Sequence, residues 1–178
     1  LRSLILAALL GALTAIGAWL QIPVGITSIT LQFLFTAFAG VLLGWKWGAV
    51  SQLLYVAIGL LGLPVFTQGV GIGYVLQPSF GFLLGLIPAA AVIGALTARR
   101  TGYLTVLAAV LVGDLILYAV GVPYMYLILH VYMQSAKTFS ALLAAMLVYV
   151  PGDTLKIIVV TALAPVLRRT LAKAVPNL

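Results

Sequence analysis

The sequence predicts an all-α membrane protein with six transmembrane helices, and three observations lead to this fold class. Hydrophobic residues make up 65% of the 178 residues and charged residues only 6%, whereas a soluble domain averages about 25% charged residues. Several apolar stretches approach the length of roughly 20 residues that a helix needs to cross a bilayer. Basic residues stand singly or in pairs between these stretches, as in cytoplasmic loops. We therefore expect one domain, residues 1–178, embedded in the lipid bilayer.

Six apolar stretches are the candidate spans. They are Leu4–Leu20, Ile29–Leu43, Gly48–Leu63, Ser79–Ala98, Leu104–Val120 and Leu142–Leu167. The first stretch has no polar domain behind it, so we expect a retained span and not a cleaved signal. The aromatic segment Gly121–Ser140 is expected to be an interfacial segment or an extended end of the fifth helix.

The distribution of basic residues predicts the orientation in the membrane. With the N-terminus in the cytoplasm, six crossings place seven basic residues inside: Arg2, Lys46, Arg99, Arg100, Arg168, Arg169 and Lys173. Lys137 then falls outside and Lys156 lies within a span. Because cytoplasmic loops carry the excess of Lys and Arg, both termini are expected inside. The outer loops are then 21–28, 64–78 and 121–140.

The composition argues against several functional classes. Nine basic and two acidic residues give a net charge of +7, but they do not gather on a polar face as they do in nucleic-acid-binding proteins. The chain has no cysteine and one histidine, His130, which we expect to be an ordinary interfacial residue. No Gly-x-x-x-x-Gly-Lys-Ser/Thr run is present. We therefore expect no metal, cofactor or catalytic site, and uphill transport would need ATP from another protein or an ion gradient.

An acid and a base lie one helical turn apart in the last candidate span, within Pro151-Gly152-Asp153-Thr154-Leu155-Lys156. Asp153 and Lys156 share one helix face, and Pro151 is expected to kink that helix. Ionisable groups in hydrocarbon are costly and by default mark a functional site. A structural ion pair is the alternative, and both roles can hold. A carboxylate and an ammonium suit a ligand with amide-like or urea-like groups.

The outer stretch between the third and fourth spans has the composition of a pocket wall or lid. Its alternating glycines, Gly69, Gly71 and Gly73, would let the backbone approach a ligand closely. Its candidate contacts are aromatic rings and amides: Tyr74, Phe82, Gln68 and Gln77. An ordinary mobile loop is the alternative.

Four further positions within the spans are candidates. Gln32 is expected inside the bundle, as helix–helix glue or as a ligand contact, because a lone amide facing lipid is unfavourable. Ala8 and Ala12 share one helix face and let another helix come close, a pattern also common in packing within a bundle. Asp114 needs a partner or a proton, and we expect it to be structural before ligand-binding.

Several of these motifs together resemble the BioY family, the biotin-binding S components of energy-coupling factor transporters. The most specific is Tyr-Val-Ala-Ile-Gly-Leu-Leu-Gly-Leu-Pro-Val-Phe at residues 55–66. Further matching segments bring the resemblance to nearly the whole chain: Ile29–Gln32, Gly40–Gly44, Pro78–Gly85 and Pro151–Lys156. The sequence departs from the family pattern at Ser79 and Phe82, where Thr and Tyr are usual, and at Gln68 and Val70, where small residues are common.

The resemblance implies six helices, an outward-facing vitamin pocket and high-affinity capture of biotin. In the family the Asp and Lys of the last-span motif contact the ligand, which carries over to Asp153 and Lys156. The small residues of the first span face the shared transmembrane coupling subunit, which carries over to Ala8 and Ala12. That subunit works with two cytoplasmic ATPase subunits.

Two other functions compete with biotin capture. One is an S component for another vitamin, or a stand-alone carrier of small solutes. The other is an intramembrane enzyme, for which Asp114 and Asp153 are the only acids available and would have to meet at the same depth of the membrane.

Overall fold

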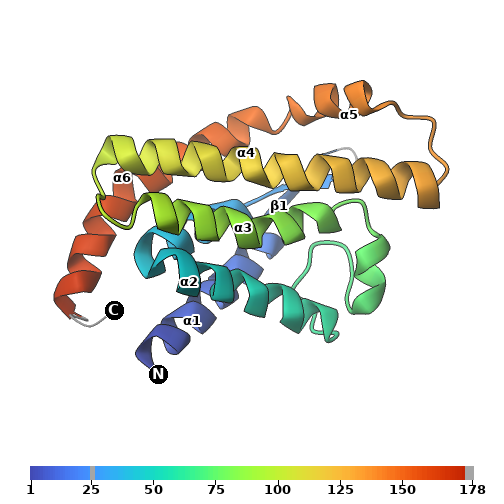
Figure 1. The fold of residues 1–178 in the computed structure, drawn as a ribbon. Coiled ribbons are helices and arrows are strands. Elements are labelled where there is room, and N and C mark those ends of the chain that lie inside the picture. Colours follow the sequence, from blue (N-terminus) through green and yellow to red (C-terminus); the bar gives the residue numbers. More distant parts are fainter. Residues whose placement is uncertain (25–26, 175–178) are drawn as a thin grey trace.

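The computed structural model describes residues 1–24 and 27–174 and is mostly helical (Figure 1). Residues 25–26, which belong to the predicted loop 21–28, and residues 175–178 lie outside the described residues. The elements in chain order are α1 Arg2–Trp19, β1 Gln21–Val24, β2 Thr27–Thr30, α2 Gln32–Leu60, η1 Ile72–Leu76, α3 Phe80–Leu96, α4 Tyr103–Leu127, the π-helical turn η2 Ile128–Tyr132, α5 Phe139–Met146 and α6 Val150–Ala174.

Helix α2 is a hairpin of two antiparallel arms that meet at Gly44. This glycine has φ 77° and ψ −178°, a conformation that a residue with a Cβ rarely adopts. Successive contacts between the two arms lie further and further from the turn at Gly44. Gly40 lies against Gly48, and Thr36 Oγ1 lies 2.9 Å from Gln52 Oε1. Gln32 Nε2 then donates to Tyr55 OH at 2.7 Å. The two arms correspond to the second and third predicted spans.

Six helical segments form the bundle, so the predicted fold class is confirmed: α1, the two arms of α2, α3, α4 and α6. Helices α1, α4 continued by η2, and α6 are each long and apolar enough to cross a membrane. Helix α2 reaches that length only when its two arms are counted together, and α3 is a shorter apolar helix. Glycines allow the closest packing. A Cβ on Gly94 of α3 would overlap the backbone at Gly44 and Trp45, and one on Gly113 of α4 would overlap Ile93.

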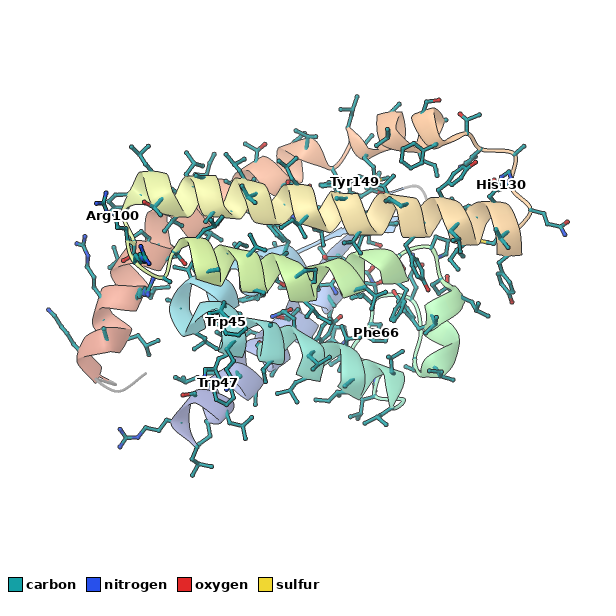
Figure 2. All side chains as sticks on the ribbon, viewed as in Figure 1. Trp45, Trp47, Phe66, Arg100, His130 and Tyr149 are labelled. Carbon is teal, nitrogen blue, oxygen red and sulfur yellow. The ribbon has the colours of Figure 1, made fainter. Side chains whose placement is uncertain are left out.

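The two ends of the bundle differ in character. The start of α1 and the end of α6 lie at one end, together with Arg100, Trp45 and Trp47 (Figures 1 and 2). The opposite end carries the β-hairpin, η1, the segment between α4 and α6, and His130 (Figures 1 and 2). At the first end Arg168 Nη1 of α6 donates to the Thr97 carbonyl at 2.5 Å and so satisfies a free carbonyl at the end of α3.

Two short strands, β1 and β2, were not predicted from the sequence. Strands β1 and β2 pair antiparallel with Ile22 opposite Ile29, so Ile29 and Thr30 belong to a strand and α2 begins only at Gln32. The Tyr149 hydroxyl donates to the Val24 carbonyl at 2.5 Å, which ties β1 to the start of α6.

The last two predicted helices have different bounds in the structure. Helix α4 extends to Leu127 and continues as η2, so part of the segment Gly121–Ser140 is an extension of the fifth helix, one of the two predicted outcomes. The sixth span does not run from Leu142, because α5 ends at Met146 and α6 begins at Val150. Pro151 therefore does not kink α6: it occupies the first turn, where a proline costs no hydrogen bond.

Candidate functional site

A partly open cavity of about 680 Å³ lies among β2, α2, α3, α4 and the start of α6. Apolar side chains cover much of its wall: Ile29, Phe33, Phe82, Leu83, Leu86, Leu117 and Met146. Polar groups converge on it from several elements: Thr27, Ser28, Thr30, Gln32, Thr67, Tyr74, Ser79, Tyr118, Tyr149, Asp153 and Lys156. An apolar wall with a few placed polar groups is typical of a ligand site.

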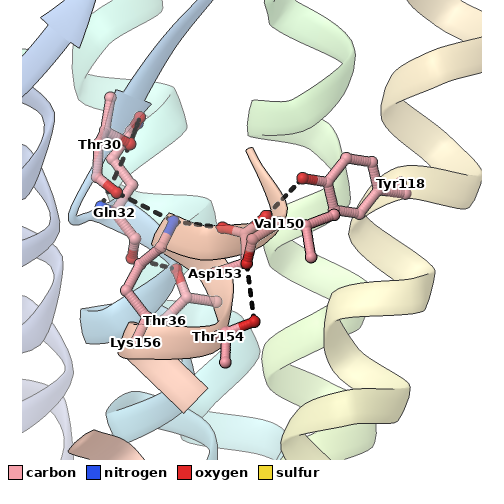
Figure 3. Close-up of polar contacts among 8 residues, drawn as sticks. All are labelled: Thr30, Gln32, Thr36, Tyr118, Val150, Asp153, Thr154 and Lys156. Carbon is pink, nitrogen blue, oxygen red and sulfur yellow. Dashed lines mark hydrogen bonds and ion pairs between the residues drawn. The ribbon is translucent and has the colours of Figure 1, made fainter. Parts of the chain in front are cut away.

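Asp153 and Lys156 form a buried ion pair in the cavity wall (Figure 3). They lie in the first two turns of α6, and their residues are 6% and 7% exposed. Lys156 Nζ lies 2.5 Å from Asp153 Oδ1 and donates to the Thr30 carbonyl at 3.2 Å. On the other side of the carboxylate, the Tyr118 hydroxyl of α4 donates to Asp153 Oδ2. The pair thus joins α6 to β2 and to α4.

The β2 side of the cavity is held by a chain of hydrogen bonds that starts at Thr30. Its hydroxyl donates to Gln32 Oε1 at 2.8 Å, and Gln32 Nε2 donates to the Tyr55 hydroxyl. Tyr55 in turn donates to the Val65 carbonyl at 3.0 Å. The carbonyl that accepts from Lys156 is therefore anchored to α2 and to the outer loop that follows it.

The α3 side of the cavity is built from aromatic rings. The Tyr74 hydroxyl lies 3.0 Å from Thr67 Oγ1 and 3.1 Å from Ser79 Oγ. Phe82 packs edge-on against Tyr118, with ring centroids 5.9 Å apart. Tyr118 also donates to the carboxylate of Asp153. It therefore contacts both the aromatic part of the wall, through Phe82, and the ion pair.

The structure brings together five of the seven predicted ligand contacts. Asp153, Lys156, Tyr74, Phe82 and Gln32 line the cavity. The other two, Gln68 and Gln77, are not among its lining residues. The alternating glycines do not line it either, and two of them shape the loop by positive φ: Gly69 at 154° and Gly71 at 76°.

Sequence reasoning missed the residues that reach the cavity only through tertiary packing. No sequence motif pointed to Tyr118 or Tyr149, although aromatic rings with a polar tip are common at such sites. Ser28 was missed because the β-hairpin was not predicted, and its Oγ is buried without a hydrogen-bond partner among the described residues. Tyr118 lies one turn from Asp114, but this spacing alone does not distinguish it from an ordinary tyrosine in a span.

The remaining predicted positions lie elsewhere in the bundle. Ala8 and Ala12 are exposed on α1, while the other face of this helix packs on α2, where a Cβ on Gly11 would lie 3.0 Å from the Ser51 carbonyl. Asp114 lies in α4 and is not among the lining residues. Its Oδ1 is buried and has no hydrogen-bond partner within residues 1–24 and 27–174. His130 stacks on Tyr126 at 5.4 Å.

Comparison with known proteins decides the family. Residues 1–173 match the BioY family. The chain belongs to this family. A probable biotin transporter BioY of Lysinibacillus sphaericus is 47% identical over 140 residues, which cover 78% of this chain and 71% of that protein. The biotin transporter BioY of Thermotoga maritima is 34% identical over 165 residues, covering 92% and 94%.

A solved structure agrees with the family assignment. The crystal structure of the S-component for biotin from an ECF-type ABC transporter superposes with a TM-score of 0.83 at 30% identity, covering 94% of this chain and 91% of that one. The chain is thus a multi-pass membrane protein of a transporter family, located in the cell membrane. The family assignment rules out the alternative of an intramembrane enzyme.

Proposed function

We propose that this protein captures biotin with high affinity from outside the cell and delivers it to an ATP-driven coupling module. The observation that carries the proposal is the ion pair of Asp153 and Lys156 in the wall of a cavity that both polar and apolar side chains line. A buried pair without a ligand role is weak evidence for stability, because desolvation offsets the attraction. A ligand that supplies matching polar groups gives a reason to keep both charges in the membrane.

The chemistry of biotin fits the groups in the wall. Its ureido ring offers two N–H donors and one carbonyl oxygen, so Asp153 can accept from an N–H. Lys156 can donate to the ureido oxygen or to the carboxylate of the side chain. The fused sulfur-containing ring is apolar and suits the rings of Tyr74 and Phe82. Ser28, with its unpartnered Oγ, supplies a further hydroxyl.

The orientation follows from the two ends of the bundle. We place the end with the start of α1, the end of α6 and Arg100 in the cytoplasm, in accordance with the positive-inside rule. The cavity then lies in the outer half, since Asp153 and Lys156 lie near the start of α6, far from the end of that helix. Ala8 and Ala12 present small side chains on the exposed face of α1, where the transmembrane coupling subunit would dock, and two cytoplasmic ATPase subunits would supply the energy.

Calorimetry of the purified protein in detergent tests the proposal directly. Tight, saturable binding of biotin is expected. A thermal-shift panel with other vitamins, such as riboflavin and thiamine, should show stabilisation by biotin alone. Stabilisation by another vitamin and not by biotin would instead favour the alternative of a different S component, and transport of biotin by the chain alone in proteoliposomes would favour a stand-alone carrier.

Replacing Tyr118 with Phe is expected to weaken biotin binding roughly threefold to tenfold. The change removes one hydrogen bond to a charged carboxylate, which contributes about 1.5–3 kcal/mol, while keeping the ring that packs on Phe82. Only part of this loss reaches the ligand, because the hydroxyl acts through the position of Asp153. Calorimetry measures the affinity, and Tyr132→Phe on the exposed end of η2 is the matched control. An unchanged affinity for Tyr118→Phe would contradict this role.

A further inference from the structure

Five basic residues gather where α3 ends, α4 begins and α6 ends. They form the basic cluster: Arg99, Arg100, Arg168, Arg169 and Lys173. The cluster comes from two separate parts of the sequence, which one side chain joins. Arg168 Nη1 donates to the Thr97 carbonyl at 2.5 Å, and its Nη2 donates to the Ala98 carbonyl at 3.4 Å. Because Arg99 and Arg100 follow directly, the two arginine pairs lie next to each other.

The charge of the basic cluster is not balanced within the chain. Four of its members are exposed: Arg99, Arg100, Arg169 and Lys173. The sequence has two acidic residues, and neither is near. Asp153 lies in the first turn of α6, at the other end of that helix. Asp114 lies roughly 16 Å along α4 from Tyr103 at a rise of 1.5 Å per residue, too far for an ion pair. The counter-charge must therefore come from another molecule.

An exposed apolar surface adjoins the basic cluster on both helices. Arg169 and Lys173 are four residues apart and share one face of α6. The same face continues towards the middle of the helix with exposed apolar residues: Ile158, Ala162 and Val166. A similar exposed face on α4 begins just after Arg100: Leu104, Ala108, Leu111 and Leu115. Cations at the end of an apolar surface match the headgroup and the acyl chains of a phospholipid.

We propose that the basic cluster, with the adjoining apolar faces of α4 and α6, binds an anionic phospholipid by its headgroup. Phosphate oxygens accept paired hydrogen bonds from guanidinium groups, and basic clusters next to membrane helices bind anionic headgroups. The topology of the chain requires only that basic residues lie on one side of the membrane, not that two arginine pairs converge. Arg168 holds the pairs together through the carbonyls at the end of α3. This site does not depend on the proposed capture of biotin.

Thermal melts in mixed micelles test the site. The purified protein in maltoside detergent is titrated with phosphatidylglycerol, with phosphatidylcholine of the same acyl chains, or with soluble glycerol phosphate. We expect the melting temperature to rise saturably with phosphatidylglycerol and with neither of the others. Native mass spectrometry of the same samples should show phosphatidylglycerol retained on the protein.

A variant with Arg100→Gln and Arg169→Gln removes one charge from each pair and keeps the bonds of Arg168. A basic residue near an anionic surface changes the affinity about fivefold, so half-maximal stabilisation should need at least about tenfold more phosphatidylglycerol. The matched control, Arg2→Gln with Lys46→Gln, removes two exposed charges outside the cluster and should respond as the wild type does. Equal melting temperatures in phosphatidylcholine show that the variants are folded, and Arg99→Gln with Arg169→Gln replaces a cluster variant that is not.

Several results would overturn the proposal. A similar rise with phosphatidylcholine would show a general effect of lipid, and a similar rise with glycerol phosphate would show a site for a soluble anion. An equal loss in the control would show a diffuse effect of net charge. If phosphatidylglycerol had no effect and the cluster variant no longer co-purified with the coupling subunit, the cluster would bind an acidic protein surface instead.

Discussion

Replacing Lys156 with Met is expected to weaken biotin binding at least tenfold and to lower the melting temperature of the ligand-free protein. The substitution leaves the Asp153 carboxylate, 6% exposed, without the ammonium that lies 2.5 Å away. Truncating one partner of a buried charge pair costs about 2–5 kcal/mol, and about 1.4 kcal/mol corresponds to a tenfold change in affinity. Asp153→Asn is expected to weaken binding to a similar degree.

A double variant distinguishes ligand binding from a purely structural role. Asp153→Asn combined with Lys156→Met removes both charges, so neither is left buried and unpaired, and the melting temperature should recover towards the wild-type value. Biotin should still bind at least tenfold more weakly, because the groups that match its ureido ring and carboxylate are gone. Calorimetry and a thermal melt on the same samples give both quantities.

The control for this series is Lys137→Met in the exposed segment between η2 and α5, which should change neither affinity nor stability. If the double variant bound biotin within threefold of the wild type, the pair would be a structural device and the site would have to be placed elsewhere in the cavity. Recovery of stability without recovery of binding is the result that the proposed site requires.

The six helices could be predicted because lipid imposes a simple pattern on the sequence. The spans are mostly apolar, and glycine, proline or basic residues mark most of the turns, as Gly44 and Arg99-Arg100 do. The break between α5 and α6 could not be predicted, since residues 142–150 form an unbroken apolar run. Pro151 was the available signal, because a proline is favoured in the first turn of a helix, where its missing N–H costs no hydrogen bond.

The charged residues gave the clearest signal for the candidate site, because a charge is out of place in an apolar span. Asp153 and Lys156 were found because ionised groups inside a span are rare. Tyr118 and Tyr149 could not be singled out, since a tyrosine in a span is ordinary until the fold brings its hydroxyl to a carboxylate or to the Val24 carbonyl. The hairpin 21–30 is short and contains Pro23, a residue that argues against a strand.

Placing Leu at both Ala8 and Ala12 is expected to abolish assembly with the coupling module while leaving biotin affinity unchanged. Both alanines are exposed on α1, and small residues spaced four apart let the backbones of two membrane helices approach closely. Two larger side chains would hold the partner helix away. Neither residue lines the cavity, so the isolated protein should bind biotin as before.

Co-purification with the transmembrane coupling subunit and the two ATPase subunits measures assembly, and uptake of labelled biotin by whole cells measures its consequence. Ala108→Leu, a substitution at an exposed position of α4, is the matched control and should leave both unchanged. Both variants add leucine side chains to an exposed helix face, so what differs between them is whether that face belongs to α1 or to α4. Normal assembly of the α1 variant would contradict docking at this face, whereas loss of assembly in the α4 control as well would point to a general effect of added bulk.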